Sequence, residues 1–233
     1  KTIDPKTRVL ALSSVQFFNG YKNNLKTIGD ICREKDIFFV VDAIQGIGAV
    51  DLDVREYQID LLSCGGEKWL LSSLGTGFFY LSSFAKRKIN PVFFSWLSVD
   101  WKLNFTDVMK YDLQPFPSAR KFEMGTYPYS LLWTMHSSLQ LLSEIGVKNI
   151  EKHNLKLLDL LINGLRAKGY RITSSLEYDH RSSILSFSGK NIRNLYEKLL
   201  KKNILVSLRE GSIRVSPHFY NSEEEINRLI EML

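Results

Sequence analysis

The stretch that most limits the fold runs from Ile37 to Gln45, where an apolar run ends in a carboxylate. The residues IFFVV at 37–41 come directly before Asp42. A short apolar run of this kind suits a strand that is buried on both faces, as in a parallel sheet. Because ligands of open α/β sheets lie beyond the carboxyl ends of the strands, we expect Asp42 to lie beside a ligand.

A lysine that follows a glycine pair adds a second constraint, in the segment GGEKW at 65–69. Glycines allow the backbone and a ligand to approach each other closely. An aspartate at the end of a buried strand, followed by a lysine beside glycines, fits a site for pyridoxal 5'-phosphate (PLP). In such a site the aspartate partners the pyridinium nitrogen, and the lysine forms the Schiff base.

Three motifs carry a family resemblance: DAIQ at 42–45, GGEKW at 65–69 and GTG at 75–77. In this order they resemble the class V aminotransferases, a family that includes the cysteine desulfurases. The resemblance extends from Arg8 to the C-terminal residues. It implies an α/β protein of PLP-dependent transferase fold type I. Part of the large mixed-sheet domain is then expected at residues 1–146, and a small C-terminal α+β domain at 147–233.

The resemblance also assigns roles within the cofactor site. Lys68 would be the catalytic residue that forms the Schiff base and moves a proton at the substrate α-carbon. Asp42 would keep the pyridine nitrogen protonated, and Gln45 would donate to the ring hydroxyl. Thr76 would reach the phosphate of the other subunit, which implies a homodimer. The simpler alternatives are a capping role for Asp42 and turn positions for Gln45 and Thr76.

Two arginines near the end of the chain are candidates for binding the carboxylate of a small amino-acid substrate. Arginine suits this task because its guanidinium can hold a planar carboxylate through two hydrogen bonds. Arg209 stands at the position that resembles the family's substrate arginine, and Arg214 is the second choice. Either could instead be an ordinary surface charge.

Several positions depart from the family pattern. Glu67 and Gly65 stand where the family usually has His and Ser, which leaves phosphate binding to the backbone, to Thr76 or to residues upstream. No cysteine lies between 207 and 219, where a desulfurase needs its nucleophile; Cys64 and Cys32 lie elsewhere. Persulfide transfer is therefore disfavoured. By resemblance, the large domain begins upstream of Val9, so part of the sheet, a phosphate-binding turn and a ring-stacking residue are expected outside this chain.

Composition excludes other classes of protein. The chain has 233 residues, is 44% hydrophobic, and has no apolar stretch near the ~20 residues of a membrane span. Its net charge of +6 is expected to be a solvated surface, because no nucleic-acid-binding motif accompanies it. Two cysteines make no disulfide framework, and the scattered histidines lack the spacing of metal ligands. The cytoplasm is the expected location.

Periodicity predicts the secondary structure. A buried strand that leads into a loop is expected at 8–17. Strands are also expected at 37–42, 77–81, 170–174, 184–188, 204–208 and 213–216, and a short helix followed by a strand at 50–64. Helices are expected at 23–35, 129–145, 147–167 and 191–202, and a last helix opens with the capping-box spacing of Ser222 and Glu225. The aromatic stretch 91–117 is expected to be an extended, irregular loop over the active site or at a subunit contact, and its apolar residues 93–105 favour a homodimer.

The sequence therefore predicts a PLP-dependent class V aminotransferase-like enzyme that acts on a small amino acid through Lys68. A cysteine or selenocysteine lyase, or an epimerase, of the same family is an alternative, as is a catalytically inactive binding protein on the PLP fold.

Overall fold

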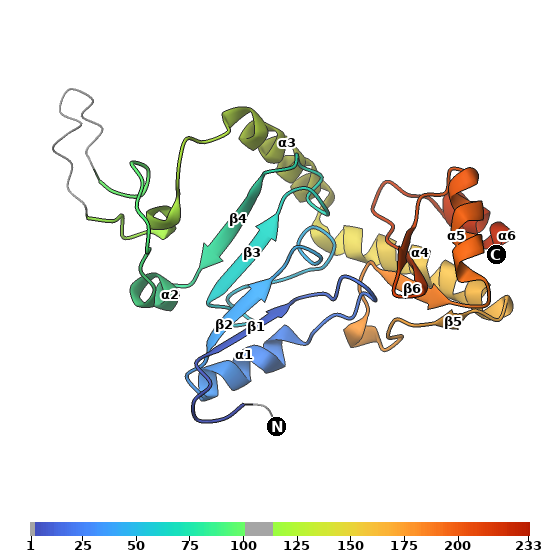
Figure 1. Ribbon diagram of the computed structural model, residues 1–233, viewed down its shortest axis with the longest axis horizontal. Coiled ribbons are helices and arrows are strands. Elements are labelled where there is room, and N and C mark those ends of the chain that lie inside the picture. Colours follow the sequence, from blue (N-terminus) through green and yellow to red (C-terminus); the bar gives the residue numbers. More distant parts are fainter. Residues whose placement is uncertain (1–2, 101–113) are drawn as a thin grey trace.

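The computed structural model describes residues 3–100 and 114–233, which form two four-stranded sheets (Figure 1). The large sheet has the order β1-β2-β3-β4. Neighbours β1, β2 and β3 run parallel, and β4 runs antiparallel to β3. This confirms the predicted mixed sheet of an α/β fold. The strands are β1 (Val9–Ser13), β2 (Phe38–Asp42), β3 (Leu61–Gly65) and β4 (Gly77–Leu81).

The register of the large sheet gathers the ends of its strands at one edge. Asp42 pairs with Ser13 of β1 and with Ser63 of β3, and Gly65 pairs with Gly77. Because β4 runs the other way, it starts at the edge where the other three strands finish. The segment that carries Lys68 connects β3 to β4, so both of its ends are fixed at this edge.

One face of the large sheet is the core of this part of the molecule. Phe39, Val41 and Leu62 are fully buried there, in a cluster that includes residues of α1 (Leu25–Glu34) and α3 (Tyr129–Ile145). The strand and loop expected over 8–17 are present, because β1 ends at Ser13 and a loop follows. The expected burial of this strand was wrong: Val9 is 55% exposed, and within the described residues β1 pairs only with β2.

The small sheet has the order β5-β6-β8-β7, and all of its neighbours are antiparallel. Helices α4 (Val147–Ala167), α5 (Ile192–Lys201) and α6 (Glu223–Met232) surround a second core, in which Leu161, Leu165 and Phe187 are fully buried. Strands and helices of this kind confirm the predicted α+β character. The strands are β5 (Arg171–Ile172), β6 (Leu185–Ser188), β7 (Ser207–Arg209) and β8 (Ser212–Val215).

Local signals explain several boundaries. α3 and α4 meet at Gly146, whose φ of +83° suits a glycine, and both helices have the predicted limits. The predicted capping box of Ser222 and Glu225 is present. The helix predicted after residue 50 was wrong: Asp53 accepts from the backbone N–H of Arg55 at 2.7 Å and forms a turn instead.

The remaining short elements are α2 (Ser83–Lys88) and two 3-10 helices, η1 (Ala119–Phe122) and η2 (Tyr178–His180). In the aromatic stretch, residues 91–100 and 114–117 are irregular as predicted, with one bridge between Val99 and Pro115. Trp101 and Phe105 lie outside the described residues.

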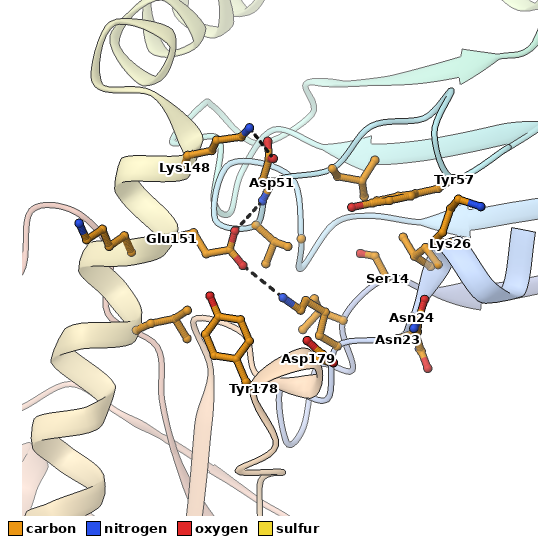
Figure 2. Close-up of a pocket in the computed structure, with 18 of the residues that line it drawn as sticks. Ser14, Asn23, Asn24, Lys26, Asp51, Tyr57, Lys148, Glu151, Tyr178 and Asp179 are labelled. Atoms are coloured by element: carbon orange, nitrogen blue, oxygen red, sulfur yellow. Dashed lines mark hydrogen bonds and ion pairs between the residues drawn. The ribbon is translucent and has the colours of Figure 1, made fainter.

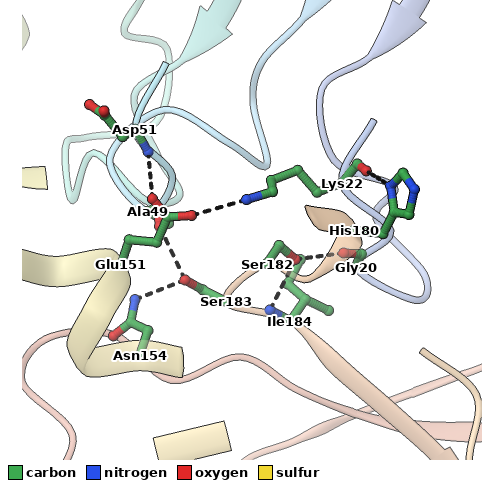
Figure 3. Close-up of polar contacts among 10 residues, drawn as sticks. All are labelled: Gly20, Lys22, Ala49, Asp51, Glu151, Asn154, His180, Ser182, Ser183 and Ile184. Atoms are coloured by element: carbon green, nitrogen blue, oxygen red, sulfur yellow. Dashed lines mark hydrogen bonds and ion pairs between the residues drawn. The ribbon is translucent and has the colours of Figure 1, made fainter. Parts of the chain in front are cut away.

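A group of polar contacts joins the two sheets (Figure 3). Glu151 of α4 binds the Lys22 ammonium at 3.3 Å and accepts from the Asp51 backbone N–H at 3.0 Å. On the small-sheet side, Ser183 Oγ donates to the Ala49 carbonyl at 3.2 Å, and Ser182 Oγ donates to the Gly20 carbonyl at 2.7 Å. These contacts hold the small sheet beside the carboxyl edge of the large one. In the described ranges, no helix is long and apolar enough to cross a membrane.

Candidate active site

A cavity of about 520 Å³ lies where the carboxyl edge of the large sheet faces strands β7 and β8 of the small sheet. It brings together four of the six residues predicted from the sequence. These are Gln45, Lys68, Arg209 and Arg214, and the other lining residues are Phe17, Trp69, Ser216, His218 and Tyr220. Lys68 and Arg209 come from opposite sheets, so the cavity exists only because the two sheets meet.

Lys68 is exposed on a loop that closes on itself. The backbone N–H of Gly66 donates to the Thr76 carbonyl and that of Ser72 to the Gly66 carbonyl, both at 2.9 Å. A Cβ atom at Gly66 would lie 2.3 Å from Thr76 Oγ1. A side chain at position 66 would therefore displace the Thr76 hydroxyl and strain the loop.

Gln45 is oriented by the residue that follows Lys68. The Trp69 indole N–H donates to Gln45 Oε1 at 3.0 Å, and the two residues are 6% and 7% exposed. Since an indole nitrogen can only donate, the amide oxygen of Gln45 must face Trp69. The Nε2 hydrogens of Gln45 are then the group that it can offer to a ligand.

Asp42 ends β2 at the same edge but lines a different hollow, of about 410 Å³, together with Cys64, Gly65 and Phe78. The Asp42 side chain is exposed, and Oδ1 accepts from the backbone N–H of Ile44 at 3.0 Å. The described residues directly after Asp42 form a turn and no helix, so this bond stabilises a turn and is not the helix cap considered as the simpler alternative. It occupies one carboxylate oxygen and leaves the other available to a ligand.

Thr76 lies outside both hollows. It is 7% exposed, and its hydroxyl donates to the Ser73 carbonyl at 2.7 Å and lies 3.0 Å from Ser72 Oγ. In this chain the hydroxyl therefore stabilises the Lys68 loop. Its predicted contact with the phosphate of another subunit stays a prediction.

Arg214 is a partly buried cation with an unused donor. Its Nη1 donates to the Phe17 carbonyl, while its Nε is buried without a hydrogen-bond partner. Burial lowers the pKa of Arg214, and the neighbouring charge of Arg209 lowers it further. Arg209 itself is exposed, and its Nη1 makes only a long contact of 3.4 Å to the Leu208 carbonyl. Within the described residues neither arginine has a carboxylate partner, so the pair fits an anionic ligand.

Gly65 and Glu67, the two residues of the lysine motif that depart from the family pattern, lie against each other. A Cβ atom at Gly65 would lie 2.5 Å from Glu67 Oε2 and 3.1 Å from Glu67 Cδ. The Glu67 carboxylate thus folds back over Gly65 and fills the place of the hydroxyl side chain that the family usually has there. An ionised carboxylate can only accept hydrogen bonds, so this pair offers no donor to a phosphate.

Neither cysteine is suited to nucleophilic chemistry. Burial, followed by the charges of Asp42 and Glu67, raises the pKa of the Cys64 thiol to about 12. Burial, followed by the charge of Asp60, also raises the pKa of Cys32. Both thiols are buried and protonated at neutral pH, whereas the nucleophilic form of cysteine is the thiolate. Among the described residues, no group of three or more His, Cys, Asp or Glu side chains could hold a metal ion.

Sequence reasoning missed His218, which is 3% exposed and lines the cavity. Its Nε2 lies 3.0 Å from the Trp69 carbonyl oxygen, and its Nδ1 accepts from the backbone N–H of Phe219 at 2.8 Å. Burial lowers the pKa of His218, and the contact with Trp69 opposes this only in part. The spacing of the four histidines disfavours a metal site but says nothing about a single buried imidazole. The aromatic run HFY at 218–220, close after Arg214, was the available signal.

A larger cleft of about 1000 Å³ lies beside α4, away from Lys68 (Figure 2). Its cations are largely paired already: Lys22 with Glu151 at 3.3 Å, and Lys148 with Asp51 at 3.5 Å. Lysines and carboxylates line it in similar numbers, so its charge selects no class of ligand. The smaller cavity, with its two unpaired arginines, is therefore the candidate active site.

Comparison with known proteins agrees with this geometry. The family model described as "Aminotransferase class-V" matches residues 1–229. The chain belongs to the class V aminotransferase family. A protein named as an uncharacterized aminotransferase, YcbU of Bacillus subtilis, is 26% identical over 98% of this chain and 60% of its own length. A probable cysteine desulfurase of Methanothermobacter thermautotrophicus is 28% identical over 99% of this chain and 61% of its own length.

Solved structures show the same fold. The cystine C-S lyase C-DES, in complex with its product cysteine persulfide, has a TM-score of 0.87 and 23% identity, over 98% of this chain and 61% of that one. The apo cysteine desulfurase of Thermococcus onnurineus NA1 has a TM-score of 0.86 and 21% identity, over 96% of this chain and 58% of that one. Fold type I is therefore confirmed. The chain spans about 60% of the length of the relatives that it matches.

PLP is the cofactor of this family, and another structure of C-DES is described as having glycine covalently linked to its PLP cofactor. The residues present here fit such a group. Lys68 is exposed to the cavity, Gln45 has a free amide donor beside it, and Arg214 has a buried N–H without a partner. A PLP-bound amino acid is an anion with polar groups on a planar ring, which these donors can bind.

Proposed function

We propose that this chain carries the lysine and the substrate-binding half of a PLP-dependent class V enzyme that acts on a small amino acid. The observation that carries the proposal is the cavity shared by Lys68, Gln45 and two arginines that have no carboxylate partner among the described residues. Bound PLP supplies an electron sink for negative charge that develops at the substrate α-carbon.

Each residue then has a defined task. Lys68 Nζ would hold the cofactor, and as a free amine it would take and return the proton of the substrate α-carbon. Asp42 would keep a proton on the ring nitrogen through its open carboxylate oxygen, and Gln45 Nε2 would donate to the ring hydroxyl. Asp42 ends β2 and Gln45 follows it at the carboxyl edge of the large sheet, where ligands of such sheets bind.

Arg214 is the better candidate for the substrate carboxylate, which reverses the order expected from the sequence. Its Nη1 is anchored on the Phe17 carbonyl, so Nε and Nη2 remain on one edge of the guanidinium. Two parallel N–H donors of this kind match a planar carboxylate. Arg209 is more exposed and adds positive charge to the same cavity.

The experiment that tests the proposal is borohydride trapping of PLP, followed by peptide mass mapping. We expect the trapped cofactor on the peptide that contains residue 68, and none in Lys68→Ala. Lys152→Ala is the matched control, since Lys152 is also exposed but lines the other cleft. An undiminished amount of trapped cofactor in Lys68→Ala would refute the role of Lys68.

A cysteine lyase that uses no cysteine nucleophile is a second candidate. It is supported by the buried, protonated thiols of this chain and by the similarity to C-DES, named as a cystine C-S lyase. Incubation with L-cysteine or L-cystine distinguishes the reactions: β-elimination releases sulfide from cysteine and cysteine persulfide from cystine, whereas an aminotransferase requires a keto-acid acceptor. An epimerase would instead invert the α-carbon without either product.

The remaining proposals concern assembly. We propose a cytoplasmic homodimer, a domain boundary near residue 146, and a contact between Thr76 and the phosphate of the other subunit. Light scattering measures the dimer. Mixed dimers of Lys68→Ala and Thr76→Val subunits test the contact, because one intact site per dimer should return if Thr76 acts across the interface.

A further inference from the structure

One imidazole links the small sheet to the backbone beside Lys68. His218 lies between β8 and α6, and its Nδ1 accepts from the Phe219 backbone N–H at 2.8 Å. The ring proton must therefore lie on Nε2, which donates to the Trp69 carbonyl at 3.0 Å. Both ring nitrogens are used, so the tautomer and the ring orientation are fixed together.

The link continues from Trp69 into the cofactor site. The Trp69 indole donates to Gln45 Oε1 at 3.0 Å and determines which end of the Gln45 amide faces the cavity. The His218 ring packs against Trp69 with a centroid distance of 5.4 Å and stacks on Tyr220 at 5.3 Å. A continuous contact therefore runs from the loop after β8, through His218 and Trp69, to Gln45.

We propose that His218 is a positioning residue: it holds the Lys68–Trp69 backbone in place and, through Trp69, sets the donor direction of Gln45. This role rests on the proposed function of Lys68. The same strand and loop carry Arg214, on β8. The segment 214–218 therefore couples the arginine proposed for the substrate carboxylate to the geometry of the lysine and the glutamine.

The first test needs no cofactor. Tryptophan indole N–H signals are recorded by ¹⁵N NMR, and that of Trp69 is assigned with Trp69→Phe. In His218→Leu the Trp69 indole N–H should exchange with water ~10-fold faster, as expected for the loss of about one hydrogen bond. His218→Gln keeps a donor near the position of Nε2 and should restore protection. If His218→Leu does not fold, His218→Asn replaces it, because its donor is too short to reach the Trp69 carbonyl.

His180→Leu is the matched control. His180 also contacts a backbone carbonyl, that of Lys22 through Nδ1 at 2.9 Å, but it does not line the Lys68 cavity. It should leave the Trp69 signal unchanged. Unchanged Trp69 exchange in His218→Leu or His218→Asn would overturn the positioning role.

The second test uses PLP, and it separates the two proposals. His218→Leu should weaken PLP binding ~10-fold, with recovery in His218→Gln, as for the loss of one hydrogen bond. If the wild-type chain traps no PLP on Lys68, the proposed function fails while the NMR result still decides the role of His218. If Lys68 traps PLP and His218→Leu binds it as tightly as the wild type, only the positioning role fails.

Discussion

Replacing Arg214 by methionine should separate binding of the substrate carboxylate from a structural role. Methionine keeps much of the aliphatic volume and removes the charge. A charge-assisted hydrogen bond contributes about 1.5–3 kcal/mol, so binding of an amino acid should weaken by roughly 10- to 150-fold. Arg209→Met should have a smaller effect, because Arg209 is exposed and its charge is screened by water.

The stability of the chain should respond very differently. The substitution removes the bond from Nη1 to the Phe17 carbonyl, but it also removes a buried Nε that has no partner. Loss of the charged hydrogen bond should lower the stability by about 1–3 kcal/mol. Removal of the unsatisfied buried donor should raise the stability by a similar amount. The free energy of unfolding should therefore change by no more than about 2 kcal/mol in either direction. Breaking a buried ion pair would instead destabilise the fold by about 3–5 kcal/mol.

The assay compares the affinities of two ligands for two proteins, each loaded with PLP. L-Cysteine and its decarboxylated analogue cysteamine are titrated into wild type and Arg214→Met, and the change in visible absorbance gives the affinities. Wild type should bind L-cysteine more tightly than cysteamine by roughly 10- to 150-fold, and Arg214→Met should lose that preference. Equal preference in both proteins, or a loss of stability above about 3 kcal/mol, would refute the reasoning.

Three further predictions concern stability and reactivity. Gly66→Ala should lower the free energy of unfolding by about 1–3 kcal/mol, because its Cβ would lie 2.3 Å from Thr76 Oγ1. Gly65→Ala should cost less, since the flexible Glu67 carboxylate can move; equal losses in denaturant unfolding would contradict this. The pKa of His218 is lowered in the fold, so its contribution to stability should be complete above the unfolded pKa of about 6.5 and decline as the pH falls below it. His218→Gln should lack this pH-dependent part of the stability. If wild type and His218→Gln show the same dependence of the unfolding free energy on pH, His218 does not contribute to it. During turnover of L-cysteine, no persulfide should form on Cys64 or Cys32, because their thiols are buried with raised pKa values; mass spectrometry that detects one would reject this.

Strong local signals made much of the fold predictable. The limits of α3 and α4 follow from the apolar periodicity on both sides of Gly146, and α6 follows from its capping box. Predictions failed where neighbours in space decide the outcome. β1 reads as a buried strand, but it pairs on one side only among the described residues, and Val9 is exposed.

The candidate site was predictable in its residues more than in its geometry. The motifs indicated Lys68 and Gln45, and the residue type indicated the two arginines. No sequence pattern, however, shows that Arg214 has a buried Nε without a partner, which is the observation that favours it over Arg209. The contact of His218 with Trp69 joins residues from the two sheets, and such a contact depends on how the sheets meet.

The closed loop from Gly66 to Thr76 limits the loss of backbone conformational entropy that binding at Lys68 would require. Ordering the backbone of a free residue costs about 1–2 kcal/mol, and a loop that became ordered only on binding would add that cost for each of its residues. Here Gly66, Ser72 and Thr76 are already bonded to one another, and Leu71 is held at a φ of +54°. Lys68 is thus presented from a backbone whose disorder was lost when the chain folded. The proposed attachment of PLP to Lys68 would therefore order little additional backbone in this loop, and less of the contact free energy would be spent on ordering it.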